Sequence, residues 1–143
     1  MEIERKFLIK NVPENLGDYE CLQIKQGYLC RKPVVRVRSS NDSYILTYKG
    51  GGMMAREEYN LPLNEKAFIH LLEKVDGTII EKKRYLIPFG KYTIELDHFQ
   101  SPNQGLFLAE VEFESVEEAE AFTPPEWFGK EVTYDKNYHN SNM

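Results

Sequence analysis

Apolar and polar residues alternate along most of the chain, which is the pattern of strands that bury one face. Runs of this kind predict eight strands, at about residues 2–10, 22–31, 34–40, 43–50, 55–62, 79–88, 91–99 and 106–114. Turn sequences such as Asn41-Asp42, Gly50-Gly51-Gly52 and Pro88-Phe89-Gly90 separate several of the strands. Because short links join antiparallel neighbours, we expect an antiparallel sheet.

Two segments have the apolar spacing of helices. Residues 65–76 follow Asn64, a candidate N-cap, and end before Gly77. Their apolar stripe comprises Phe68, Ile69, Leu71, Leu72 and Val75. Ser115 and Glu118 have the spacing of a capping box and predict a short helix over 115–122, which Pro124-Pro125 ends. The tail from Trp127 onward shows no clear pattern and is expected to be irregular.

Charge repeats on the face opposite the apolar one in seven of the predicted strands. In chain order the repeats are Glu2-x-Glu4-x-Lys6, Arg36-x-Arg38, Thr47-x-Lys49, Arg56-x-Glu58, Lys82-x-Arg84, Glu95-x-Asp97 and Glu110-x-Glu112. Any one of these faces could simply be solvated, as in many half-buried strands. Arginines two positions apart on one strand repel unless they share an anion, and paired carboxylates suit a shared hard cation. If the strands close into a barrel, both clusters face one cavity, and a triphosphate with bound metal is the simplest ligand for it.

The overall charge and the cysteines limit the class of protein. The net charge is −5 and the sequence pI about 5.3, so the chain lacks the global positive field that would attract nucleic acid or an anionic membrane. No apolar run is long enough for a membrane span, and the first residues lack a signal core. Cys21 and Cys30 are expected to be buried, reduced thiols, which together with these observations favours a cytoplasmic protein.

The charged repeats, in this order and followed by Asp135-Lys136, resemble the signature of the CYTH superfamily, also called triphosphate tunnel metalloenzymes. The resemblance covers nearly the whole chain and implies a single CYTH domain over residues 1–143. The implied fold is α+β and mainly β: an eight-stranded antiparallel closed barrel, the triphosphate tunnel, with a charged interior and a few peripheral helices.

The resemblance also implies roles for the charged residues, together with one or two Mg²⁺ or Mn²⁺ ions as cofactor. The metal ligands would be Glu2, Glu4, Glu58, Glu95, Asp97, Glu110 and Glu112. The phosphate-binding side chains would be Lys6, Arg36, Arg38, Lys49, Arg56, Lys82, Arg84 and Lys136. Catalysis would depend above all on Glu4, Lys6, Glu58 and Glu112. The three histidines have no ligand spacing and receive no role.

The function expected from this resemblance is metal-dependent hydrolysis of a small triphosphate, first of all of inorganic tripolyphosphate to pyrophosphate and phosphate. ATP and thiamine triphosphate are alternative substrates, and the same tunnel supports adenylate cyclase chemistry in relatives. A non-catalytic polyphosphate or nucleotide sensor would need the cations without the many carboxylates. A carrier of apolar ligands would need apolar side chains to line the interior of the barrel, so the inward and outward faces of every strand would have to be exchanged. A second copy of the chain could cover outward apolar surface, so a homodimer is a further hypothesis.

Overall fold

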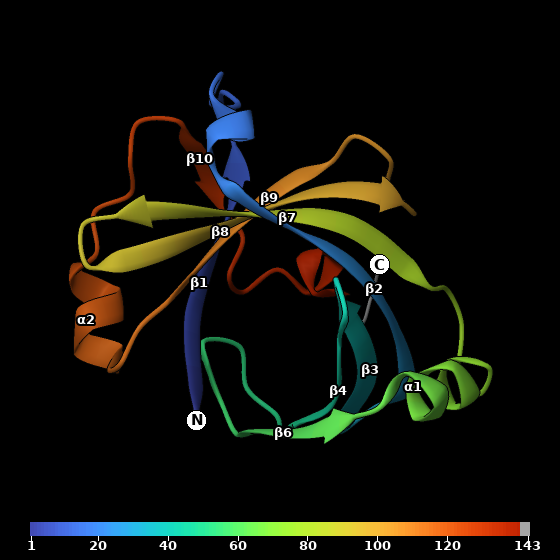
Figure 1. Ribbon diagram of the computed structural model, residues 1–143. Coiled ribbons are helices and arrows are strands. Elements are labelled where there is room, and N and C mark those ends of the chain that lie inside the picture. The colour runs from blue at the N-terminus through green and yellow to red at the C-terminus, as the bar shows by residue number, and fades with distance from the viewer. Residues whose placement is uncertain (141–143) are drawn as a thin grey trace.

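Antiparallel strands curve into a ring, which Figure 1 shows nearly end-on. The computed structural model describes residues 1–140, and the elements named below lie in that range. The strands are β1 (Glu2–Ile9), β2 (Glu20–Arg31), β3 (Val34–Ser40), β4 (Ser43–Lys49), β5 (Ala55–Arg56), β6 (Glu58–Leu63), β7 (Ile80–Phe89), β8 (Tyr92–Ser101), β9 (Phe107–Glu112) and β10 (Phe128–Glu131). The helices are α1 (Glu65–Leu72) and α2 (Val116–Ala121), with single 3-10 turns η1 (Leu16–Asp18) and η2 (Lys136–Tyr138).

The sheet is a nearly closed barrel, which confirms the predicted fold. Its strand order is β10-β1-β9-β8-β7-β2-β3-β4-β6, and β5 pairs with β1. The predicted strand 55–62 is divided after Arg56, because its two parts pair with opposite edges of the sheet. Glu58 lies opposite Lys49 of β4, whereas Arg56 lies opposite Glu2 of β1. This division joins the two edges and closes the ring.

The tail contains a strand that the sequence pattern did not predict. β10 pairs with the edge of β1 that β9 leaves free, with Phe7 opposite Glu131 and Ile9 opposite Phe128. Arg5 donates to both carboxylate oxygens of Glu131, at 2.9 and 2.7 Å. The expectation of an irregular tail was therefore wrong for Phe128–Glu131. These four residues lack the alternation of a strand, and they form one because they pair with β1.

Both predicted helices are present, and the first is shorter than expected. α1 ends at Leu72 rather than near residue 76, although Gly77 does adopt a positive φ of 84°. Asn64 caps it by accepting the amide N–H of Ala67 at 2.7 Å, as predicted. Ile69 is 53% exposed, so its place on the buried stripe was wrong. Neither helix within residues 1–140 is long and apolar enough to cross a membrane.

A hydrophobic core lies on the outside of the barrel wall. Alternation sends the apolar side chains of β1, β8 and β9 outward, where Phe7, Leu96 and Val111 are almost fully buried. Phe122, which follows α2, and Phe128 of β10 pack onto them. The outward apolar face is therefore covered, at least here, by the chain itself. Ser115 caps α2 as predicted, through the N–H of Glu118 at 3.1 Å.

A second apolar cluster lies inside the barrel, beyond the charged part of the bore. Leu108 and Phe99 share the inward face with the acidic residues of β9 and β8, and they pack with Tyr28, Ile80 and Val132. Tyr138, at the end of η2, packs against the same cluster. Figure 1 shows this turn within the ring of strands. The interior is therefore charged in one part and apolar in another.

The two cysteines lie near opposite ends of β2 and are both free thiols, as predicted. Cys21 is exposed and Cys30 is half-buried, so the prediction that both are buried was wrong.

Candidate functional site: a cavity with carboxylates and arginines

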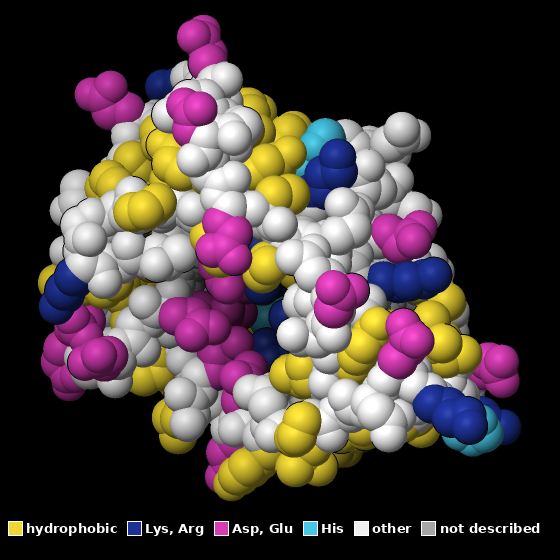
Figure 2. Space-filling view, viewed as in Figure 1, with side chains coloured by type: hydrophobic (Ala, Val, Ile, Leu, Met, Phe, Trp, Pro, Cys, Tyr) yellow, Lys and Arg dark blue, Asp and Glu magenta, His cyan; other side chains and the backbone are white. Residues whose placement is uncertain are grey.

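A single charged cavity occupies the bore. Twelve of the predicted site residues line it: Glu2, Glu4, Lys6, Arg36, Arg38, Lys49, Arg56, Glu58, Arg84, Glu95, Glu110 and Glu112. Figure 2 looks into the hollow and shows acidic side chains around its rim, with basic side chains deeper inside. Adjacent strands bring these residues together because β1, β9 and β8 carry the acids and β3 carries two of the arginines.

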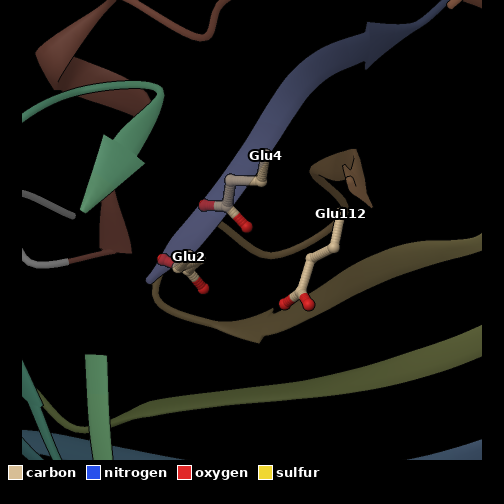
Figure 3. A group of neighbouring side chains, drawn as sticks. All are labelled: Glu2, Glu4 and Glu112. Carbon is tan, nitrogen blue, oxygen red and sulfur yellow. The ribbon is translucent and has the colours of Figure 1, made fainter. Parts of the chain in front are cut away.

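Three carboxylates form a compact group at one side of the cavity. Glu2 and Glu4 lie on β1, and Glu112 lies at the end of β9 opposite Glu4. One oxygen of each lies within 4.8 Å of the others. Figure 3 shows the three side chains turned toward a shared space. Neither Glu4 nor Glu112 has a cation within ion-pairing distance among the described residues, and Glu4 Oε2 is buried there without a hydrogen-bond partner.

Burial and mutual repulsion make these carboxylates hard to ionise. Burial raises the pKa of Glu4 well above its ordinary value, and the charges of Glu110 and Glu2 raise it further. The pKa of Glu112 is raised to about 7 by burial and by the neighbouring acids, with Glu95 the largest contributor among them. The pKa of Glu2 is also raised by burial, although Lys49 opposes the shift. A positive charge placed between these groups would reverse all three effects.

Another part of the cavity wall consists of ion pairs that are already satisfied. Lys49 Nζ lies 2.8 Å from Glu2 and 3.5 Å from Glu58. Lys6 Nζ lies 3.7 Å from Glu110 and donates to the backbone carbonyl of Tyr138 at 3.0 Å. These cations are therefore partly neutralised before any ligand binds.

The pKa values of two further acids are low, in contrast to those of the carboxylate group. Burial alone would raise the pKa of Glu110, but the charges of Lys6, Arg84 and Lys82 outweigh it and hold the pKa well below the ordinary value. Burial likewise opposes ionisation of Glu58, but a hydrogen bond from Glu2 and the charge of Lys49 lower its pKa. Both groups remain ionised at neutral pH.

Three arginines in the cavity differ from these paired cations. Arg36, Arg38 and Arg56 have no carboxylate within 4.0 Å in the described part of the chain. Arg36 Nη2 donates to Thr47 Oγ1 at 3.3 Å, while its buried Nε has no acceptor within residues 1–140. Arg56 Nε donates to the carbonyl of Gly50 at 3.1 Å. Unpaired guanidinium groups around a cavity form a binding site for an anion.

Two predicted site residues lie behind the cavity wall rather than on it. Lys82 and Asp97 are fully buried, with Lys82 Nζ 2.8 Å from Asp97 Oδ2. Asp97 also accepts two hydrogen bonds from Arg84, at 2.7 and 2.9 Å. Burial lowers the pKa of Lys82 to about 7. Neither residue lines the cavity: Lys82 lies over the ring of Phe99 in the apolar cluster, and Asp97 supports Arg84. Their expected roles as phosphate and metal ligands stay predictions.

Lys136, the last predicted phosphate ligand, lies away from the cavity. It is exposed and lines a separate hollow on the outer surface with Lys130 and Tyr134. The neighbouring η2 turn directs His139 and Asn140 into the cavity instead. Lys136 therefore does not line the cavity among the described residues, and its expected role in phosphate binding stays a prediction.

The cavity also contains residues that sequence reasoning missed. Tyr28, Asn60, His139 and Asn140 line it, and fully buried Gln26 supports it from behind. His139 Nε2 lies 3.2 Å from the carbonyl oxygen of Thr133, and burial, aided by Lys6, lowers the pKa of the ring. Alternation along 22–31 could have placed Gln26 and Tyr28 on one face, but nothing in the local pattern of the tail indicated His139.

The donor set fits a hard divalent cation. Mg²⁺ and Mn²⁺ prefer carboxylate oxygens, and here three carboxylates with raised pKa values converge, of which only Glu2 is paired with a cation, Lys49, among the described residues. The orphaned Glu4 Oε2 supports the same reading. Glu2, Glu4 and Glu112 would hold the ion, while Glu58, Glu95 and Glu110 lie on the same cavity.

Fold and site together define a barrel whose interior can take up a small polyanion and a hard cation in one cavity. Comparison with known proteins agrees: the CYTH domain family matches residues 1–140, and the chain belongs to that family. It is 40% identical to the inorganic triphosphatase of Nitrosomonas europaea, over 97% of this chain and 93% of that protein. It is 39% identical to the inorganic triphosphatase of Acetivibrio thermocellus, over 99% and 92%.

A solved structure supports the same fold. The crystal structure of the inorganic triphosphatase NE1496 superimposes with a TM-score of 0.72 and 36% identity, covering 99% of this chain and 93% of that one. The predicted CYTH resemblance is thus confirmed in both sequence and structure.

Proposed function

We propose that this protein hydrolyses inorganic tripolyphosphate to pyrophosphate and phosphate with the help of Mg²⁺ or Mn²⁺. The observation that carries the proposal is the coexistence, in one cavity, of three arginines without a carboxylate partner and two carboxylates, Glu4 and Glu112, without a paired cation among residues 1–140. Neither set neutralises the other, so a ligand that combines a polyanion with a metal ion satisfies both. The activity of the related inorganic triphosphatases supports the choice of substrate.

The protein's own groups would act mainly by positioning and by balancing charge. Arg36, Arg38 and Arg56 would bind phosphate oxygens and offset the charge that develops on the departing pyrophosphate. Glu58, which its surroundings keep ionised, is a candidate to orient the attacking water. A divalent ion held by Glu2, Glu4 and Glu112 would supply Lewis-acid polarisation and a more acidic water.

The remaining parts of the proposal concern the cellular location, the oligomeric state and the alternative activities. The free thiols agree with a reducing cytoplasmic environment, which we propose as the location. Two exposed apolar side chains of β6, Tyr59 and Leu61, are each 60% exposed and leave room for the predicted homodimer. Nucleoside and thiamine triphosphatase activity, cyclase activity and non-catalytic sensing remain alternatives that the following assay separates.

Phosphate release from tripolyphosphate, ATP and thiamine triphosphate, with Mg²⁺, with Mn²⁺ and with a chelator, tests the proposal. We expect the highest kcat/KM with tripolyphosphate and loss of activity in chelator. Cyclic AMP from ATP would indicate the cyclase, and tight binding of every substrate without turnover would indicate the sensor. Undiminished turnover in chelator would contradict the role of the metal.

A further inference from the structure

Arg38 is held in the cavity wall by an uncharged partner. Its Nε donates to Gln26 Oε1 at 2.7 Å, and this is the hydrogen bond that the structure gives Arg38 within residues 1–140. The two residues face each other across β2 and β3. Gln26 is fully buried and does not line the cavity, whereas Arg38 does. Gln26 therefore does not touch a ligand in the cavity, whereas Arg38, its hydrogen-bond partner, can.

The neighbouring Arg84 shows the alternative arrangement. Asp97 accepts two hydrogen bonds from it, and Glu95 and Glu110 add charge at 3.3 and 3.9 Å. These carboxylates fix Arg84 firmly but neutralise it. Gln26 fixes Arg38 with the same kind of acceptor oxygen and leaves its positive charge uncompensated.

That uncompensated charge is unfavourable in the absence of a ligand. Burial and the nearby cations Arg36 and Arg84 lower the pKa of Arg38 to about 9. Gln26 itself has an unsatisfied group, since its buried Nε2 has no acceptor in the described residues. Buried orphan donors are rare in folded proteins and are often found at functional sites. An anion in the cavity would offset the repulsion among Arg36, Arg38 and Arg84.

We propose that Gln26 is a positioning residue for triphosphate binding, which orients the Arg38 guanidinium toward the cavity and preserves its charge. The inference rests on the proposed function and extends it to a residue that does not touch the substrate. An amide is suited to this role because a carboxylate of the same shape would hold Arg38 but cancel the charge that attracts phosphate.

The isosteric substitution Gln26→Glu separates positioning from packing. It keeps the acceptor oxygen and the volume, and it supplies Arg38 with a countercharge. The added charge by itself weakens the binding of an anion, so a merely structural role predicts normal affinity only in the uncharged variant Gln26→Met. The positioning role predicts that thermal stability is kept or raised while the Kd for tripolyphosphate, by calorimetry in chelator, rises about tenfold or more. The KM should rise in parallel, with a smaller change in kcat.

Gln23→Glu is the matched control, since Gln23 lies on the same strand, is exposed and faces outward. It adds the same charge to the protein and should leave Kd and KM unchanged. Gln26→Met provides a second variant that removes the acceptor without adding charge, and it should also weaken binding.

The outcomes distinguish this inference from the proposed function. If wild type releases no phosphate from tripolyphosphate, the proposed function fails, whereas the calorimetric comparison still tests Gln26. If wild type binds tripolyphosphate and both Gln26→Glu and Gln26→Met bind it within twofold of wild type, the positioning role is overturned. Absence of binding to wild type overturns it as well.

Discussion

Arginines on this chain have different functions according to what surrounds them. Arg5 lies on the outer face, where it binds Glu131 and donates to the backbone carbonyls of Ala119 and Phe122. It joins β1 to β10 and to α2. Arg38 lies on the inner face, and its hydrogen-bond partner among residues 1–140 is the neutral Gln26. The first residue is therefore expected to stabilise the fold and the second to bind substrate at some expense of stability.

Substituting these two arginines should have opposite effects. Arg38→Met should raise the KM for tripolyphosphate more than tenfold and lower the melting temperature less than Arg5→Met does, because Arg38 is half-buried and has no carboxylate partner in the described residues. Arg5→Met should lower the melting temperature and leave the KM close to wild type. Thermal denaturation and steady-state kinetics on both variants provide the check. A fall in stability of Arg38→Met without any change in KM would contradict the assignment.

Closure of the barrel depends on short elements that bring together distant edges of the sheet. β5 has two residues, and its pairing with β1 places Arg56 opposite Glu2. The preceding loop contributes the carbonyl of Met54, which accepts the N–H of Glu4 at 3.0 Å. Gly52 in this loop has φ of 114°, and a Cβ built there would lie 2.4 Å from the carbonyl oxygen of Ala55. The glycine therefore permits the turn that leads into β5.

Gly52→Ala should disturb this closure without disrupting the core. We expect a loss of roughly 1–2 kcal/mol in the free energy of unfolding from the backbone strain, together with a higher KM because Arg56 shifts. Gly51→Ala is the control, since a Cβ at Gly51 meets no atom within 4 Å. Urea denaturation and kinetics measure both effects. Equal behaviour of the two variants would show that the turn tolerates a side chain.

At the scale of the whole molecule, the cavity makes the ligand-free protein carry charges that repel one another. Glu112 has a pKa of about 7 against an ordinary value of 4.5, and the pKa of Glu4 is raised in the same direction. A raised pKa means that the folded state binds protons more tightly than the unfolded state. The stability supplied by Glu112 is therefore complete below about pH 4.5 and is lost as the pH rises to about 7.

The contribution of Glu112 to the free energy of unfolding of the metal-free protein should accordingly fall between pH 5 and pH 8. The lowered pKa of Glu110 acts only below its ordinary value. The lowered pKa values of His139 and Lys82 act in the opposite sense in parts of this range, so the Glu112 contribution is the difference between wild type and Glu112→Gln. Glu112→Gln should remove much of the decline, and added Mg²⁺ should reduce it in wild type because a cation favours the ionised carboxylates. Urea denaturation in chelator at both pH values measures this. An unchanged pH dependence in Glu112→Gln would refute the explanation.

The sequence alone determined the parts of the protein that depend on local periodicity. Alternation with a period of two predicted β3 at its observed bounds and the inward side of Glu2, Arg36 and Glu110, because a strand fixes the face of each side chain. The helix N-caps at Asn64 and Ser115 were predicted from equally local sequence signals. The order of charged repeats then gave the family.

Only the tertiary structure decided which charges neutralise one another. Lys49, Lys82 and Arg38 have similar positions in the sequence pattern, yet the first two are paired with acids from other strands and the third is not. Such pairings depend on strand order, tilt and register between segments far apart in the chain. The same holds for β10, which pairs with β1, and for the turn before His139, where the carbonyl of Tyr138 accepts a hydrogen bond from Lys6 of β1. A local pattern cannot specify partners that come together only when the barrel closes.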